Sequence, residues 1–122
     1  MTALELTIPA PCDWLNSNDR LHRMASAART KQWRAAAATT AWASPYWFDF
    51  EVPVHIVCTV HKTRAGRWDA GNLYPTAKAI VDGLVDAGVI PDDSNEYVVG
   101  PDMRAGEKRP EPCVVVRVEA IA

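Results

Sequence analysis

The residues best suited to chemistry are several carboxylates and one lysine within a short stretch of the chain. Asp69 stands in a polar loop, Lys78 and Asp82 follow in a helix-like pattern, and Asp92 and Asp93 are adjacent. Carboxylate oxygens suit Mg²⁺, which completes its shell with water and substrate phosphate oxygens. A lysine beside them can hold a phosphate or stabilise a leaving oxygen. These residue types indicate a metal-dependent phosphodiesterase as one hypothesis.

The spacing around Lys78 predicts an amphipathic helix that begins after Asn72 and ends before Gly88. Its apolar stripe consists of Leu73, Ala77, Ile80, Val81 and Leu84. Lys78 and Asp82 are four residues apart and therefore project together from this helix. The same residues have an ordinary explanation, because acids are frequent in turns and a lysine and an aspartate at this spacing usually form a surface ion pair. By spacing alone, the ordinary explanation is the better one.

The remaining elements surround this helix. Four segments have the composition and alternation of strands: residues 4–8, 52–61, 96–99 and 114–118. An Ala-rich segment over residues 31–43 predicts a second helix, capped by Thr30, and Gly100 and Pro101 end the third strand. We expect an α/β (α+β) fold, a small two-layer domain with one mixed β-sheet and two helices packed on it, over residues 1–122.

Basic residues flank the acidic stretch, although the net charge is −2. Local charge matters more than the sum for recognising an anion. The residues that we expect to contact DNA phosphates are Asn18, Arg20, Arg29, Lys31, Arg34, Arg64 and Arg67. Three of these cations lie at the start of the predicted Ala-rich helix, where the helix dipole disfavours them and an anion would compensate. The turn at Asn18 is explained equally well as a capped loop.

Aromatic and histidine residues have simpler explanations. Trp33 is expected in the core, and Trp47 and Phe48 in the core or at a subunit interface. His55 and His61 are six residues apart on one predicted strand, too far to bind one metal together. We expect both histidines at the surface and neither as a metal ligand.

Composition limits the class of protein. The 122 residues fit one domain, and 48% hydrophobic with 23% charged residues is typical of a soluble globular protein. No apolar run reaches membrane-spanning length, and the first residues lack the basic region of a signal peptide, so we expect a cytoplasmic protein. Three widely spaced cysteines without a C-x-x-C pair are expected to be free thiols.

The order of the acidic and lysine residues resembles the signature of the RusA family of Holliday junction resolvases, in which Asp-x-Asp-Asn-x-x-Lys leads a helix ending before an Asp-Asp pair. The matching residues are Asp69, Asn72, Lys78, Asp82-Gly83-Leu84, Ala87-Gly88 and Asp92-Asp93. The opening LTIPAP segment, followed by Asn18 and Arg20, is similar to the family's first strand and turn. The resemblance covers nearly the whole chain.

This resemblance implies a homodimer that cuts branched DNA, the four-way junction, symmetrically in a bacterial or phage-infected cell. It implies that Asp69 and Asp93 bind Mg²⁺, with Mn²⁺ as an alternative, and that Asp92 and Asp82 are further candidate ligands. Lys78 would assist catalysis at the phosphate.

Two departures from the family pattern bear on activity. Gly71 replaces the second acid, so Asp82, Asp92 or a water must substitute for a missing ligand. The interval before Lys78 is longer, and we expect loops to absorb the difference. One alternative is therefore a RusA-like protein that binds branched DNA or a partner without cutting. Another is a hydrolase for small phosphorylated compounds, which the basic flanks disfavour.

Overall fold

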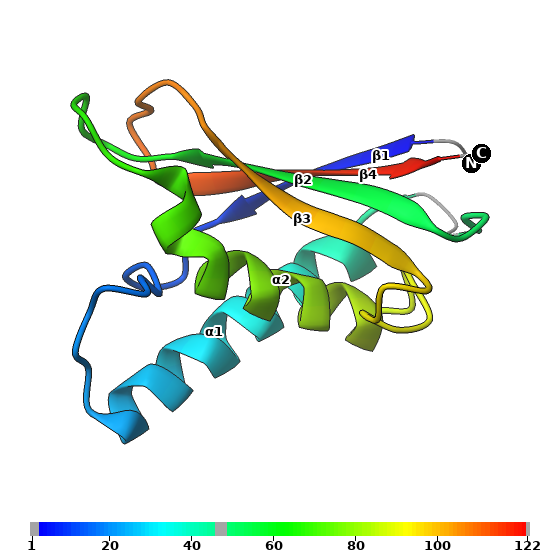
Figure 1. Cartoon of the computed structure of the whole chain (residues 1–122), viewed down its shortest axis with the longest axis horizontal. Helices are drawn as coiled ribbons and strands as arrows, with labels where there is room; N and C mark the ends of the chain where they lie inside the picture. The colour runs from blue at the N-terminus through cyan, green and yellow to red at the C-terminus, as the bar shows by residue number, and fades with distance from the viewer. Residues whose placement is uncertain (1–2, 46–48, 122) are drawn as a thin grey trace.

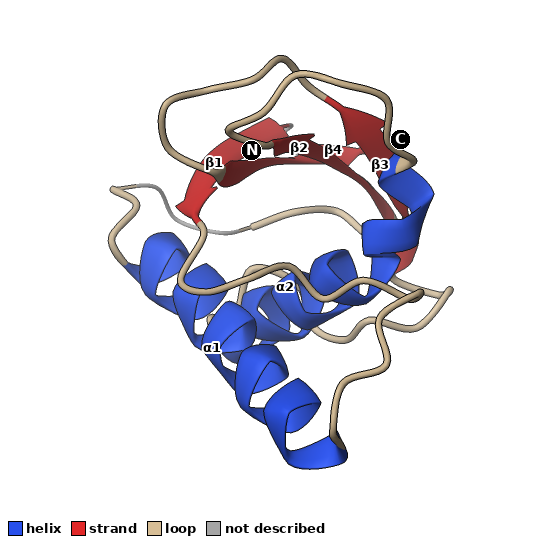
Figure 2. Ribbon diagram, turned by 90° about the vertical axis from the view of Figure 1, so that its left-hand side faces the viewer, coloured by secondary structure: helices blue, strands red, loops and turns tan. Residues whose placement is uncertain are grey.

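Two helices cover one face of a four-stranded mixed sheet, which arches over them (Figures 1 and 2). The computed structural model describes residues 3–45 and 49–121. In chain order the elements are β1 (Ala3–Pro9), α1 (Arg23–Trp42), β2 (Val54–His61), the 3-10 helix η1 (Ala70–Leu73), α2 (Tyr74–Asp86), β3 (Val98–Ala105) and β4 (Cys113–Ala120). The sheet order is β1-β4-β2-β3, with β2 parallel to β3 and the other neighbours antiparallel. The predicted fold class is confirmed.

The core lies between the sheet and the helices, where alternate strand residues meet the apolar stripe of α2. Because successive strand residues point to opposite faces, Val54, Ile56, Cys58 and Val60 of β2 are all buried on one side. The five predicted stripe residues, Leu73 of η1 and Ala77, Ile80, Val81 and Leu84 of α2, are also buried. Burial raises the pKa of the Cys58 thiol to about 12, and all three cysteines are free, as predicted.

The end of α2 follows the predicted pattern. Gly88 has a φ of 81°, which favours glycine after a helix, and Val89 N–H donates to the Leu84 carbonyl at 2.9 Å. The beginning of α2 differs from the prediction, because residues 70–73 form η1 and α2 starts at Tyr74. Helical turns rather than loops therefore absorb the longer interval before Lys78.

The first helix is longer than predicted. α1 begins eight residues before Lys31, since no glycine or proline interrupts the Ala-rich sequence upstream. Thr30 is therefore not a cap: its hydroxyl donates to the Ser26 carbonyl within the helix at 2.9 Å. His22 caps the helix by accepting from Met24 N–H at 3.2 Å. Trp33 is fully buried, as predicted.

Strand β3 also continues past its predicted end at Gly100 and Pro101. Gly100 has a φ of 102°, and the pairing with β2 shifts register between His55 and Val57. A proline is tolerated here because β3 is an edge strand with a local irregularity. The prediction that this dipeptide breaks the strand is wrong.

The two histidines of β2 differ from each other. His55 is half-buried and lies 2.6 Å from Asp102 of β3. The prediction of a surface His61 is wrong, since its ring is buried and its Nδ1 lies 2.9 Å from the Glu107 carbonyl oxygen. A side chain at Gly106 would overlap this ring, so the β3–β4 connection packs directly on it.

Two further observations complete the fold. No helix in the described ranges is long and apolar enough to cross a membrane. The expected roles of Trp47 and Phe48 lie outside the described residues.

The two helices lie in close contact at Gly83. A Cβ atom there would lie 2.3 Å from the Arg34 carbonyl oxygen and 2.8 Å from the Ala37 Cβ. Backbone cannot move aside as a flexible side chain does, so α2 needs a glycine at this position to lie against α1.

We expect Gly83→Ala to lower the free energy of unfolding by about 1 kcal/mol or more, because overpacking costs about 1–3 kcal/mol and exceeds the gain in helix propensity. Urea denaturation measures the change. Ala35→Gly is the control. It exchanges the same two residue types in reverse at an exposed position of α1, so it measures their difference in helix propensity without overpacking. A Gly83→Ala variant as stable as the original chain would show that the helices can separate without cost.

Candidate active site

Lys78, Asp82 and Asp93 converge at the surface of α2. The Lys78 ammonium donates to Asp82 Oδ1 at 3.1 Å and to Asp93 Oδ2. All three side chains are partly buried, with exposed fractions of 43%, 30% and 33% respectively, so solvent or a ligand can reach each of them. Two carboxylates therefore share one cation at an accessible position.

The turn after α2 brings Asp93 back along the helix. Val89 and Ile90 are buried beneath it and anchor its first half. Asp93 N–H then donates to Asp92 Oδ1 at 2.8 Å, and the Ser94 carbonyl accepts from the first residues leading into β3. Hydrogen bonds on both sides of Asp93 therefore fix its backbone. The Asp92 carboxylate accepts one of them within the turn and is exposed.

Electrostatics reinforce the ionised forms at this site. The hydrogen bond from Lys78 is the main cause that lowers the pKa of Asp93 below its usual range. Partial burial by itself lowers the pKa of Lys78. The hydrogen bonds to Asp93 and Asp82 outweigh this effect, so the pKa of Lys78 is raised above its usual value. The lysine and Asp93 thus stabilise each other's charged state.

Asp69 does not join this cluster. Its carboxylate accepts from Gly71 N–H at 2.9 Å and caps η1. At the usual helical rise, η1 and the first turn of α2 put on the order of 10 Å of helix between Asp69 and Lys78. In residues 3–45 and 49–121, no three acidic, histidine or cysteine side chains lie close enough to hold one metal ion.

Two of the expected phosphate contacts are engaged within the protein. Arg34 forms a bidentate ion pair with Asp86 of α2: its Nε donates to Oδ2 at 2.6 Å and its Nη2 donates to Oδ1 at 2.8 Å. Arg29 donates to the Trp14 carbonyl at 3.3 Å and lies 3.6 Å from an Asp13 oxygen. These arginines therefore have structural partners that the sequence did not reveal.

The other expected DNA contacts are exposed. Asn18 belongs to a turn in which its N–H donates to Asn16 Oδ1 at 2.8 Å, as the capped-loop alternative predicts. Arg20 follows it, Lys31 lies on α1, and Arg64 and Arg67 lie in the connection from β2 to η1; all four are exposed.

A network of contacts fixes the loop of residues 10–21 beside the start of α2. Thr76 Oγ1 accepts from Leu15 N–H and donates to the Leu15 carbonyl, both at 2.8 Å, and all of these groups are buried. Ser17 N–H donates to the Asn72 carbonyl at 2.8 Å. Asn18 and Arg20 are therefore held near η1, which Asp69 caps, and the start of α2.

Sequence reasoning missed two residues that shape this region: Thr76 and Asp86. Asp86 continues the i,i+4 spacing of Lys78 and Asp82, and that spacing could have indicated it. Nothing in the sequence pattern marks Thr76 as the partner of Leu15, because the two are 61 positions apart.

No family model matches the chain, and no curated protein matches it either.

We expect Thr76→Val to lower the free energy of unfolding by about 2 kcal/mol, because it leaves a buried N–H and a buried carbonyl of Leu15 without partners. Urea denaturation measures this loss, and hydrogen exchange of the Leu15 amide should accelerate. Thr40→Val is the matched control, since the Thr40 hydroxyl donates to the Ala36 carbonyl of its own helix. Equal stability of the two variants would mean that Thr76 does not hold the loop.

Proposed function

We propose that the chain is a RusA-like, Mg²⁺-dependent endodeoxyribonuclease that resolves four-way DNA junctions in the cytoplasm of a bacterial or phage-infected cell. The observation that carries the proposal is the convergence of Lys78, Asp82 and Asp93 at an accessible surface. All three belong to the matched part of the family signature. Exposed cations on α1 and in the β2–η1 connection give this region the charge that a phosphodiester substrate requires.

The carboxylate pair fits a hard divalent cation. The Lys78 ammonium already stands as a cation between Asp82 and Asp93, so their oxygens are placed to share a positive charge. One or two carboxylates are enough for Mg²⁺ when water and substrate phosphates complete its shell. When bound there, the ion would neutralise charge at phosphorus and supply a nucleophilic water.

Lys78 has a second role in this proposal. A divalent cation bound by Asp82 and Asp93 would compete with the Lys78 ammonium for these carboxylates, and the two like charges would repel each other. The four-carbon side chain of Lys78 is flexible, so it can turn to donate to a phosphate or leaving oxygen.

A homodimer completes the proposal. Two identical sites related by two-fold symmetry match the symmetry of a four-way junction, so each site would cut one of two equivalent strands.

We expect Asp93→Asn to reduce junction cleavage by on the order of 100-fold or more while leaving junction binding intact, because it removes a charge needed only for chemistry. A labelled four-way junction incubated with Mg²⁺ and resolved on a denaturing gel measures cleavage, and a mobility shift without metal measures binding. Asp102→Asn, which removes a carboxylate paired with His55 away from the site, is the control. Undiminished cutting by Asp93→Asn would refute the assignment.

A second function has a specific observation in its favour. Asp69 caps η1 rather than approaching Asp93, and Gly71 supplies no carboxylate where the family has one. The chain would then be a scaffold that holds branched DNA without cutting it. This alternative predicts a shifted but uncut junction at every Mg²⁺ concentration.

Gly71→Asp separates the two functions. Gly71 does not have a positive φ, and its added Cβ would lie 3.2 Å from Asp69 Oδ1, so an aspartate there places a second carboxylate beside the first. We expect Mn²⁺ affinity, measured by electron paramagnetic resonance, to rise on the order of tenfold, because affinity for hard cations follows ligand charge. Gly71→Asn adds similar bulk without charge and should leave the affinity unchanged.

Cleavage that appears only in Gly71→Asp would favour the non-cutting scaffold for the natural chain. Cleavage by both proteins would favour the nuclease. Equal Mn²⁺ affinity in the Asp and Asn variants would contradict a metal site at Asp69.

A further inference from the structure

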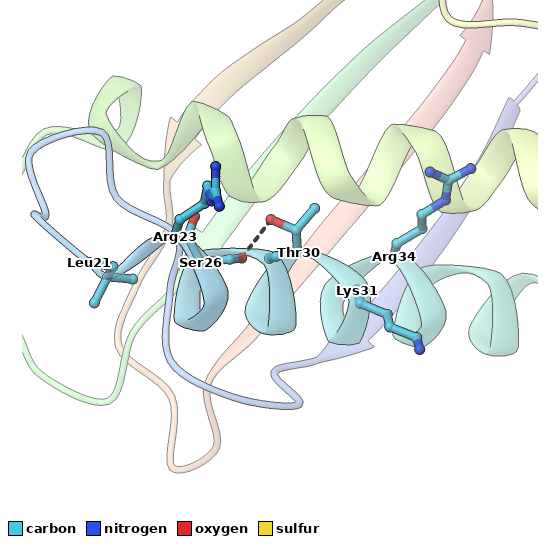
Figure 3. A pocket seen from close by; sticks show the side chains of 7 residues that line it. Leu21, Arg23, Ser26, Thr30, Lys31 and Arg34 are labelled. Carbon is cyan, nitrogen blue, oxygen red and sulfur yellow. Dashed lines mark hydrogen bonds between the residues drawn. The ribbon is translucent and has the colours of Figure 1, made fainter.

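A groove runs along the exposed side of α1 (Figure 3). Arg23 and Arg34 rise along the edge nearer α2, and Lys31 and Leu21 lie along the opposite edge. Ser26 and Thr30, with Ala27 between them, form the floor. The lining thus contains three cations and no acid, and its small floor residues leave room for a chain to lie between the edges.

The charge of this groove is only partly balanced within the described structure. Arg34 is paired with Asp86, but Arg23 and Lys31 are exposed and form no ion pair with any described residue. The first turn of α1 carries no acidic residue, so the positive end of the helix dipole adds to the same field. Two unpaired cations on one face of α1, one of them at the helix N-terminus, favour an anionic ligand.

The length of the groove suits a polymer of phosphates. Eight residues separate Arg23 from Lys31, which at the usual helical rise is about 12 Å. Phosphates of one DNA strand advance about 3.4 Å along the duplex axis, so these two cations span roughly three to four nucleotides. Ser26 and Thr30 are short enough to let a sugar-phosphate chain approach the helix.

The groove lies beside the candidate active site. Arg34, one of its lining residues, binds Asp86, which lies one turn beyond Asp82 on α2. Asp82 in turn contacts Lys78. Because α1 and α2 run in the same general direction (Figure 1), Asp82 and Lys78 lie alongside the groove rather than beyond its Arg34 end, and a strand in the groove would run beside them.

A second basic hollow is less suited to this role. It is lined by Arg20, Arg29 and Lys62, but also by Asp13 and Asp19. The acids reduce its net charge, and Arg29 is already held by Asp13 and the Trp14 carbonyl. The α1 groove is the more strongly cationic surface.

We propose that the groove along α1 binds the sugar-phosphate backbone of the DNA strand next to the active site, with Arg23 and Lys31 as its phosphate contacts. Arg34 is a positioning residue that ties this groove to α2 through Asp86 rather than a phosphate contact. This inference rests on the proposed function and adds to it Arg23, a residue that the family signature does not include.

The test is the salt dependence of junction binding, measured by fluorescence anisotropy without divalent metal from about 50 to about 200 mM salt. Each lost phosphate contact should reduce the slope of log affinity against log salt by about 0.9. Arg23→Ala and Lys31→Ala should each have this effect, and the double variant should reduce the slope by about two. Across this salt range the affinity of the original chain should therefore fall by a factor roughly ten times larger than the factor for the double variant.

Arg117→Ala is the matched control, because Arg117 is exposed on the sheet face away from the helices and the substitution removes the same charge. Its slope should equal that of the original chain. Because Arg23 and Lys31 are exposed, their alanine variants should fold like the original chain. Circular dichroism and thermal melting check this.

An unchanged slope in the double variant, or an equal reduction in Arg117→Ala, would overturn the groove assignment while leaving the proposed function in place. Failure of the original chain to bind the junction even at low salt would overturn the proposed function and the groove with it. The two failures are therefore distinguishable.

Discussion

The close contact between α1 and α2 determines how the rest of the molecule is presented. At Gly83 the backbone of α2 lies against the Arg34 carbonyl, and no larger residue fits. This contact fixes the rotation of α2, so its apolar stripe faces the core while Lys78, Asp82 and Asp86 emerge on another side. It also places the Arg34 side chain beside Asp86. The candidate site and the α1 groove are therefore consequences of one packing constraint.

Charges then follow an ordered arrangement across the two helices. Asp93 and Asp82 share Lys78, and Asp86 binds Arg34, so three carboxylates on or beside α2 are paired with two cations, one from α2 and one from α1. Exposed ion pairs contribute little to stability, typically 0–1 kcal/mol. The main effect of these ion pairs is on geometry, because they hold accessible carboxylates and cations in defined places. A site for an ionic substrate requires such an arrangement. The groove proposal extends the same arrangement along α1.

Much of the fold could be predicted because its periodic patterns are local. The alternation in β2, the stripe of α2 and the glycine after that helix each depend on neighbouring residues, and each prediction is confirmed. Errors occurred where a local rule had an exception. Thr30 resembles a cap, but the Ala-rich sequence before it is equally helical. Gly100 and Pro101 resemble a strand end, but an edge strand with a register shift accommodates them.

The sequence by itself determined the strands and the two helices and the pairing of Lys78 with Asp82, because these follow from periods of two and 3.6 residues. Only the tertiary structure decided that Asp93 returns to Lys78 while Asp69 caps η1, since these distances depend on how the turn after α2 folds back. It likewise decided that Arg34 is bound by a residue 52 positions away. Contacts between distant residues arise from packing, and no local pattern records which side chains packing brings together.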